Sequence, residues 1–514
     1  MPCAGVWDIG GQQQQTPFRA FVPSRPFTRT IQDLLSQALS AGLTKMPDNP
    51  EIWKAAAMAD QFDKMQKLPD PLPGAPNFHR IPGYKVYTTG QPTLEGIKNV
   101  LEKVTGTIYP KDGPIIWLNL RQEPDVYVNG QPICARPPNK IGEYAELGAV
   151  TRDLIKADEA EFFKVVEGRV KENGGKLKYV TITKEEKEVE VKELTTLSQA
   201  MEAAKADFPG LVHWRVPVCN SASPLETDFD IICNTLVGTS INTPIIVTDQ
   251  VGLSRATTGS VIACLFKEFQ INASFEGLVE TVPGVNLDLL KMDKYTMDPA
   301  KDPLFRGEFP VVLALLEKLK GGKEAKNECD KVIDKNGTPK TGGNGIKQLR
   351  ENIAESKLSY EIMDDAAQAF LKVKIMDNIH KYYYLIVFTA YMREMAEVAR
   401  TTMTDEQKAA LTLPGGKTAI PGNQLKLPRT FAAFMEEHSD LRGLIDSGKG
   451  DLQWERDIPA AALANLEKLA SGDFKANLGK IIHDIYQTAH LMFSDMPQGD
   501  HKKRAKYRYY GIFQ

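Results

Sequence analysis

The fold is decided by residues 244–265, which read PIIVTDQVGLSRATTGSVIACL. The apolar, β-branched run at 244–248 predicts a short buried strand, and the run that begins at Ala256 predicts an apolar helix. The loop from Asp249 to Arg255 lies between them and gathers backbone N–H groups at a helix start, where the helix dipole adds positive potential. An arginine at the far end of such a loop can close the ring with its fork of donors. The stretch predicts an anion cradle, and a buried strand–turn–helix with an incidental arginine is the structural alternative.

The first position of this loop determines its chemistry. Loops of this shape in cysteine phosphatases begin with a thiolate, which the surrounding donors keep ionised and nucleophilic. Here the first residue is Asp249, and a carboxylate is a poorer nucleophile whose charge lies where a phosphate dianion would bind. We expect Asp249 to fill the cradle itself. We also expect it to pair with Arg255, because both charges would otherwise face a partly desolvated loop.

Outward from the loop, residues 75–290 alternate between strand-like and helix-like segments, which predicts an α/β fold with a central sheet flanked by helices. The other predicted strands are 85–88, 114–120 and 211–218. The predicted helices of this part are 93–104, 141–173, 195–206, 228–237 and 256–269. Beyond Pro303 the apolar spacing is helical almost throughout, so we expect a mostly α-helical C-terminal region. Its predicted helices are 309–320, 323–334, 345–356, 364–398, 404–411, 430–446 and 460–496.

The two ends of the chain differ from this pattern. Residues 1–30 combine a glutamine run and prolines with isolated Phe and Arg, which predicts an extended arm that orders only against something else. Residues 31–71 have helical apolar spacing and are expected to form a short helical segment. Residues 451–514 are expected to be a helical segment that ends in a basic, tyrosine-rich tail at 502–513. Such basic–aromatic ends suit docking onto an acidic protein surface, with a solvated tail as the alternative.

The composition of the chain limits the kinds of partner, cofactor and location that we expect for the protein. The chain has 514 residues, 42% of them hydrophobic, and 63 Lys+Arg against 66 Asp+Glu give a net charge of −3. This balance is typical of a globular protein of several domains, and it disfavours nucleic acid as the partner. The six cysteines show no CxxC spacing and the seven histidines no HxxxH pair, so we expect neither a metal site nor a cofactor. The sequence contains neither an apolar run of about 20 residues nor a leader pattern, so we expect a cytoplasmic protein without a membrane span.

The loop and several other segments match one family in the same order. They are Ala75-Pro-Asn-Phe-His-Arg-Ile-Pro-Gly, Gly90-Gln-Pro-Thr-Leu-Glu-Gly, Trp117-Leu-Asn-Leu-Arg-Gln-Glu-Pro, Tyr127-Val-Asn-Gly-Gln-Pro, Arg215-Val-Pro-Val with Pro224 and Asp228-Phe-Asp, and Tyr382-Tyr-Tyr-Leu-Ile-Val-Phe-Thr-Ala-Tyr. Together they cover roughly residues 72–445 and resemble the paladin-like, protein-tyrosine-phosphatase-like family, which is related to inositol-phosphate phosphatases. The resemblance implies a cysteine-phosphatase-like α/β domain at 72–292. It also implies a helical extension of the paladin-like module at 293–450.

The resemblance assigns roles to positions, and two roles are vacant. The phosphate loop of the family corresponds to Asp249, Gln250, Val251, Gly252, Leu253, Ser254 and Arg255. Asp249 stands where the family has its nucleophilic cysteine. The general-acid aspartate of the family falls in 218–224, where this chain has Asn220 and no carboxylate, and an amide cannot protonate a leaving oxygen. Arg121 is a candidate anion contact, with a structural ion pair to Glu123 or another carboxylate as the alternative.

These replacements lead to two hypotheses. The first is a catalytically inactive phosphatase-like protein, a pseudophosphatase, that serves as a binding or structural module in an intracellular assembly such as a cytoskeletal or ciliary structure. Protein partners would bind through the N-terminal arm, the helical half and the basic C-terminal tail. The alternative is a phosphatase for inositol phosphates or phosphoproteins with a non-standard nucleophile. Cys219 is the one thiol in the general-acid stretch, and a small buried structural cysteine is the favoured explanation of it.

Overall fold

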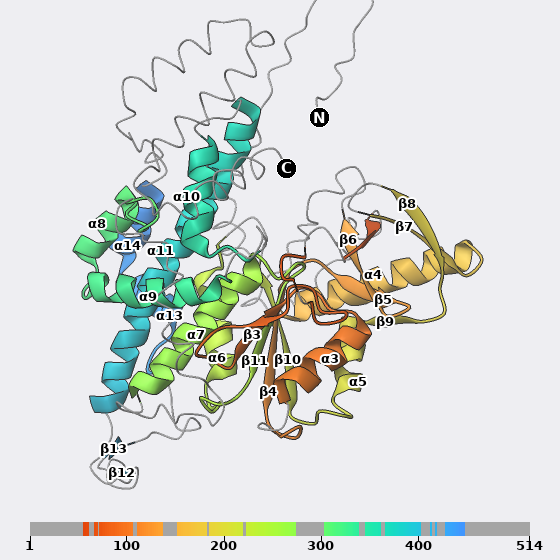
Figure 1. Cartoon of the computed structure of the whole chain (residues 1–514), viewed down its shortest axis with the longest axis horizontal. Helices are drawn as coiled ribbons and strands as arrows, with labels where there is room; N and C mark the ends of the chain where they lie inside the picture. The colour runs from red at the N-terminus through yellow and green to blue at the C-terminus, as the bar shows by residue number, and fades with distance from the viewer. Residues whose placement is uncertain are drawn as a thin grey trace, which may run out of the picture. The chain divides into compact units, whose positions relative to one another are not determined.

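The structure is a computed structural model of the chain, shown in Figure 1. It describes residues 55–60, 66–69, 71–105, 110–136, 152–181, 185–218, 223–273, 303–338, 345–360, 365–401, 412–413, 417–418 and 427–447. All of these belong to the second of two compact units, Met1–Asn49 and Pro50–Gln514. The predicted arm 1–30, the predicted helices 404–411 and 460–496, and the predicted tail lie outside the described residues.

A five-stranded sheet forms the centre of the α/β part, as the sequence predicts. Its strands, in spatial order, are β10 (Leu211–Val218), β4 (Ile115–Arg121), β11 (Ile245–Thr248), β3 (Val86–Thr89) and β2 (His79–Arg80). The first four are parallel, and the short β2 is antiparallel to β3. Every residue of β4 and β11 is buried, which is typical of parallel strands covered on both faces.

Helices cover both faces of this sheet. Trp117 and Ile246 point to one face and pack with α3 (Leu94–Thr105) and α5 (Leu197–Ala204). Leu118 and Val247 point to the other face, which packs against α6 (Glu226–Leu236) and α7 (Arg255–Ala273). The alternation along each strand sorts its side chains between two layers of helix. The predicted α/β fold class is confirmed.

The C-terminal region is mostly helical, as predicted. Its helices are α8 (Pro310–Lys318), α9 (Gly322–Asn336), α10 (Leu349–Tyr360), α11 (Asp365–Thr401), α13 (Phe431–Glu437) and α14 (Ser439–Ser447), and β12 (Thr412–Leu413) pairs with β13 (Lys417–Thr418). These helices share one hydrophobic core with a face of the five-stranded sheet. The ring of Phe229 on α6, for example, lies 5.0 Å from the rings of both Phe388 and Phe431. This core crosses the boundary that the sequence placed near residue 292. None of the described helices combines the length and apolar character needed to cross a membrane.

A second, six-stranded sheet was missed by the sequence analysis. Its strands, in spatial order, are β8 (Glu186–Glu190), β7 (Lys176–Val180), β1 (Ala56–Ala59), β6 (Gln131–Arg136), β5 (Asp125–Val128) and β9 (Leu194–Thr196). Helix α4 (Arg152–Glu172) packs on it through Phe162 and Val166. Asn129 and Gly130 join β5 to β6 with φ angles of 50° and 78°, the left-handed pair that a tight hairpin requires. This Asn-Gly pair was the available signal for the second sheet.

One predicted segment is corrected within this sheet. The predicted helical segment 31–71 contains a strand, because β1 pairs with β6 along its whole length. Alanine favours helix, so the local preference of Ala56–Ala59 is overridden by tertiary pairing. The helix predicted at 141–173 is described from Arg152 to Glu172.

Candidate functional site

The loop Asp249–Arg255 lies at the carboxyl edge of the five-stranded sheet, between the end of β11 and the start of α7. The ends of β3 and β4 lie beside it, because both strands run parallel to β11 in register. Trp117 on β4 donates its indole N–H to the Thr248 hydroxyl at 2.8 Å, which fixes the strand at the loop entrance. Open α/β sheets bind ligands at this edge. The fold therefore places the predicted cradle where a site is expected.

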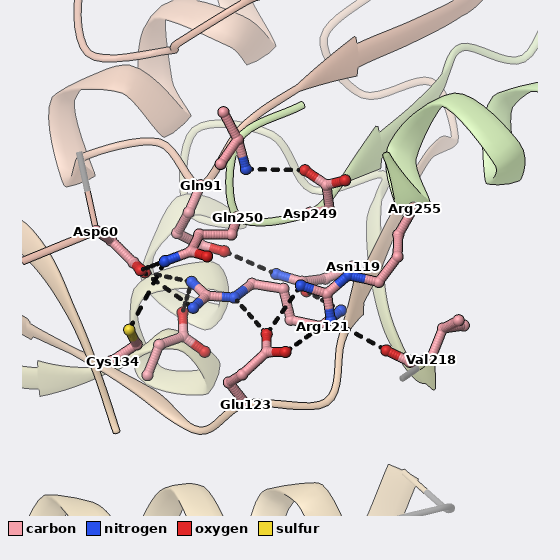
Figure 2. A network of polar contacts seen from close by, with 12 residues as sticks. Asp60, Gln91, Asn119, Arg121, Glu123, Cys134, Val218, Asp249, Gln250 and Arg255 are labelled. Carbon is pink, nitrogen blue, oxygen red and sulfur yellow. Dashed lines mark hydrogen bonds and ion pairs between the residues drawn. The ribbon is translucent and has the colours of Figure 1, made fainter. Parts of the chain in front are cut away.

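The carboxylate of Asp249 accepts hydrogen bonds from the loop itself. Its Oδ1 accepts from the backbone N–H of Val251 at 2.9 Å and from that of Gly252. Its Oδ2 accepts from the N–H groups of Ser254 at 3.2 Å and Ala256 at 2.9 Å. The side chain is 2% exposed, and Figure 2 shows one of these bonds. A fixed anion thus takes up four of the backbone donors that the loop presents.

Close backbone contacts hold the loop in this shape. Gly252 has a φ of +79°, and a Cβ atom there would lie 2.6 Å from the backbone nitrogen of Gly90. The Gln250 carbonyl accepts from the Gln91 N–H at 3.0 Å, and the Asn77 side chain donates to the Val251 carbonyl at 2.8 Å. Glycine alone combines that φ angle with that approach. The loop is braced by the segment that follows β3.

Arg255 forms a two-pronged ion pair with Glu123, and the sequence prediction of Asp249 as its partner is corrected. Its Nη1 lies 2.9 Å from Oε1 of Glu123, its Nη2 lies 3.0 Å from Oε2, and Nη1 also donates to the Val218 carbonyl at 3.0 Å. Burial alone would raise the pKa of Glu123, but the guanidinium groups of Arg255 and Arg121 outweigh it and lower that pKa to about 2. Glu123 is therefore ionised and neutralises the loop arginine.

Arg121, the predicted anion contact, is held by carboxylates in the same way. It is fully buried, forms a close ion pair with Asp60 and lies 3.4 Å from Glu123 and 3.7 Å from Asp125. Burial opposes the charge of Arg121, yet the carboxylates of Asp60 and Asp125 raise its pKa well above the ordinary value. The geometry favours the structural ion pair over an anion contact.

Arg215 on β10 secures the segment that crosses from one sheet to the other. Its Nη1 binds Asp125 at 2.9 Å and Glu159 at 3.1 Å, while its Nη2 donates to the carbonyls of Arg121 and Glu123. Burial raises the pKa of Glu159, and Arg215 opposes that effect. The crossing from β4 to β5 is thus tied by both its side chains and its backbone.

Gln250 connects the loop to the six-stranded sheet. Its side-chain amide donates to Asp60 at 2.7 Å and lies 3.8 Å from the Cys134 sulfur, and its carbonyl oxygen accepts from Arg136 at 2.7 Å. Figure 2 shows Gln250 between Asp60 and the loop. The side chain that follows the degenerate nucleophile position is therefore a bridge between the two sheets.

Together these residues form what we call the junction cluster. It contains four guanidinium groups and four carboxylates, from Arg121, Arg136, Arg215, Arg255, Asp60, Glu123, Asp125 and Glu159. All eight side chains are buried. The formal charges cancel within the cluster, so it provides no surplus of positive charge for a phosphate. Arg121, Arg215 and Arg255 are occupied by the protein's own carboxylates, and Arg136 donates to Gln250.

The remaining predicted residues are placed as follows. Leu253 is half-buried and Ser254 is exposed at the loop surface, while Asn220 and Cys219 lie outside the described residues. The aspartate closest along the chain after the general-acid stretch is Asp228, whose Oδ2 accepts from the Leu225 N–H at 2.8 Å at the start of α6. Burial raises the pKa of Asp228 to about 7.

Sequence reasoning missed half of the junction cluster. Asp60 follows β1, while Asp125, Arg136 and Glu159 come from β5, β6 and α4, and none of them stands in a motif with the loop. A partial signal was present, because Arg121, Glu123 and Asp125 alternate along the chain after a buried strand. Such spacing places charges on one side of an extended segment.

Thiol chemistry and metal chemistry find little support in the described part of the chain. Its four cysteines are buried, and burial raises the pKa of each, that of Cys134 to about 12. A thiol with such a pKa is not a thiolate nucleophile at neutral pH. Within the same residues, no group of three or more His, Cys, Asp or Glu side chains is arranged to hold a metal ion.

Comparison with known proteins agrees with the resemblance stated from the motifs. Residues 118–267 match the family model of PTP-like phytases, described by the words inositol hexakisphosphate. Paladin of Xenopus tropicalis is 26% identical over 322 residues, which are 62% of this chain and 34% of that protein. Paladin of Danio rerio is 24% identical over 360 residues, which are 63% of this chain and 38% of that protein. The chain thus spans about a third of the length of the paladins that it matches.

Two solved structures are similar at low identity. The PTP-like myo-inositol phosphatase from Mitsuokella multacida, in complex with myo-inositol-(1,3,4,5)-tetrakisphosphate, has 13% identity and a TM-score of 0.39, over 75% of this chain and 54% of that one. A PTP-like phytase from Bdellovibrio bacteriovorus has 15% identity and a TM-score of 0.30, over 48% of this chain and 77% of that one. The sequence matches to paladins and to the phytase family model confirm the resemblance to a paladin-like, PTP-like family.

Proposed function

We propose that this paladin-like chain of the PTP-like family is a pseudophosphatase, a phosphatase-like protein without catalysis that serves as a binding or structural module. One observation carries the proposal. The carboxylate at the position of the family nucleophile accepts four hydrogen bonds from the loop backbone. A phosphate would have to displace Asp249 from these donors and overcome its charge, and the nucleophile position would then offer no sulfur for attack.

The charge balance of the junction cluster supports the same proposal. In a working phosphoryl-transfer site, arginines face the charge that develops in the transition state. Here Arg255 faces Glu123 in a two-pronged pair, and Arg121 faces Asp60. Asn220 adds a second vacancy, because its amide cannot supply the proton that a leaving oxygen needs. In this proposal the loop provides no nucleophilic thiolate, the arginines provide no free positive charge, and the general-acid position provides no proton.

The proposed module acts inside the cell as a part of a larger assembly, such as a cytoskeletal or ciliary structure. Its docking surfaces would be the N-terminal arm, the helical half and the basic tail, and its partners would be proteins. Tagging the full chain in its native cells and identifying the proteins that co-purify tests this part. The assembly proposal fails if the full chain elutes alone as a monomer from native extract.

Catalysis itself is tested by phosphate release from an aryl phosphate and from inositol polyphosphates. We expect the purified full chain to release no more phosphate than the Arg255→Ala variant. Turnover that disappears in both Asp249→Ala and Arg255→Ala would overturn the proposal. It would favour the alternative, a phosphatase for inositol phosphates or phosphoproteins that uses a non-standard nucleophile.

A further inference from the structure

Strand β1 holds an unusual place in the six-stranded sheet. It has the sequence Ala-Ala-Met-Ala and lies between β6 and β7. Four registered pairs join it to β6, whereas a single registered pair, Met58 with Val180, joins it to β7. Its apolar anchors are few, since only Ala57 and Met58 within the strand are buried. The strand is thus attached mainly on one side.

The local preference of this segment opposes its strand conformation. Alanine and methionine are strong helix formers, and alanine is depleted in strands. The segment 55–60 therefore adopts its strand only through tertiary contacts. Such a conflict between local and global preference weakens the segment, and a region with few buried apolar contacts opens at a lower free energy than the core.

The neighbours of β1 have supports of their own. Five registered pairs join β7 to β8, and four join β5 to β6. Helix α4 packs against both groups, because Phe162 and Val166 share a hydrophobic core with Ile133 and Leu177. Departure of β1 would therefore leave two hairpins that remain anchored on one helix.

Asp60, immediately after β1, ties this strand to the candidate site. Its Oδ1 accepts from Gln250 at 2.7 Å and from Nη2 of Arg121 at 3.2 Å, and its Oδ2 forms the close ion pair with Nη1 of Arg121. Without Asp60, the junction cluster would hold four guanidinium groups against three carboxylates. The donors of Arg121 and Gln250 that now bind Asp60 would be left to another anion.

We propose that segment 55–60 is a detachable strand, and that its departure uncovers an oxyanion-binding site formed by the Arg121 guanidinium and the Gln250 side-chain amide. An oxyanion of phosphate size replaces the Asp60 carboxylate with the same kind of acceptor atoms. The site lies beside the loop rather than inside it, so it does not require Asp249 to leave the cradle. The proposed oxyanion site therefore goes beyond the proposed function, and the phosphate-release assay does not test it.

Hydrogen exchange of the full chain tests the opening. We expect the amides of 55–60 to exchange at least ~100-fold faster than those of β4 and β11, because local opening costs less than global unfolding. Inorganic phosphate should increase this exchange further, relative to chloride at the same ionic strength, by about tenfold at roughly ten times its dissociation constant. Equal protection of β1, β4 and β11, or no response to phosphate, would overturn the proposal.

Two variants and a control make the test independent of any one substitution. Asp60→Asn keeps the shape of the side chain and removes its charge, so it should bind inorganic phosphate more tightly than the wild type in calorimetry. Asp112→Asn removes an exposed charge ahead of β4 and should leave phosphate binding unchanged. Ala56→Val favours the strand and should slow exchange of β1 and weaken the phosphate response. An Asp60→Asn variant that folds and binds phosphate no better than wild type contradicts the proposed ligand site.

Discussion

The five-stranded sheet meets its two neighbours in opposite ways. Toward the helical region it shares an apolar core, in which the rings of Phe229, Phe388 and Phe431 pack together. Toward the six-stranded sheet it is joined by the junction cluster of buried arginines and carboxylates. An apolar contact is non-directional, so it tolerates small shifts of its side chains, whereas a buried ion pair requires both partners in place. The apolar junction therefore contributes mainly to the stability of the fold. The ionic junction mainly fixes the positions of the side chains at the candidate site.

The largest expected effect comes from removing one partner of the ionic junction. Glu123→Leu leaves Arg255 buried without its carboxylate and should lower the free energy of unfolding by about 3–5 kcal/mol. Phe388→Leu keeps the other junction apolar but leaves a small cavity, so it should cost less, about 2 kcal/mol. Urea unfolding followed by circular dichroism measures both changes.

A double variant sharpens this contrast. Glu123→Leu combined with Arg255→Met removes the whole pair and should be more stable than Glu123→Leu alone, because no uncompensated charge remains. A double variant that is less stable than either single variant would mean that packing, and not the ion pair, makes this junction sensitive.

Acid should weaken the ionic junction and spare the apolar one. The pKa of Glu123 is lowered to about 2 from an ordinary value of 4.5, so its contribution is fully present above pH 4.5 and is lost as the pH falls toward 2. A shift of this size corresponds to about 3 kcal/mol. Unfolding experiments between pH 6 and pH 2 should show a smaller loss for Glu123→Gln than for the wild type. Equal slopes for both proteins would rule out Glu123 as the source.

A moderate effect is expected at the cradle. Asp249→Ala leaves several buried N–H groups without an acceptor and should cost about 1–3 kcal/mol. Tungstate or inorganic phosphate should then raise the melting temperature of the variant more than that of the wild type, because the empty cradle adds an oxyanion site. Thermal melts with chloride as the control ion measure this. Equal stabilisation of the two proteins would mean that removing Asp249 opens no additional oxyanion site.

The smallest expected effect is the difference between two glycine substitutions, one of which lies in the loop. Gly252→Ala introduces a Cβ at φ +79° and 2.6 Å from the Gly90 nitrogen, so it should cost about 2 kcal/mol or more. Gly175→Ala has a similar φ of +90° with no atom within 4 Å of the new Cβ, so it should cost only about 1 kcal/mol. The difference between the two unfolding free energies measures the close approach of the two loops. Equal costs would mean that the loop yields to the added methyl group.

The sequence predicted the strands and the helix that form the apolar junction, but it did not predict the residues that form the ionic junction. Strands β4 and β11 appear in the sequence as largely apolar runs, and the long helix α11 appears as an apolar stripe, because burial imposes a pattern on the chain. Asp60 and Glu159 carry no such mark, because their role depends on partners 61 and 56 residues away. The sheet that contains β1 was missed for the same reason, since its strands are short, polar or rich in alanine.

The sequence by itself determined the α/β class, the strand–loop–helix at 244–265 and the carboxylate at its first position, because local pattern and residue chemistry suffice for these. Only the tertiary structure decided which charges meet. In the folded chain Arg255 pairs with Glu123, Arg121 pairs with Asp60, and Ala56–Ala59 forms a strand. The reason is physical: periodicity reports whether a residue is buried, whereas the partner of a buried charge is set by the crossing of distant segments.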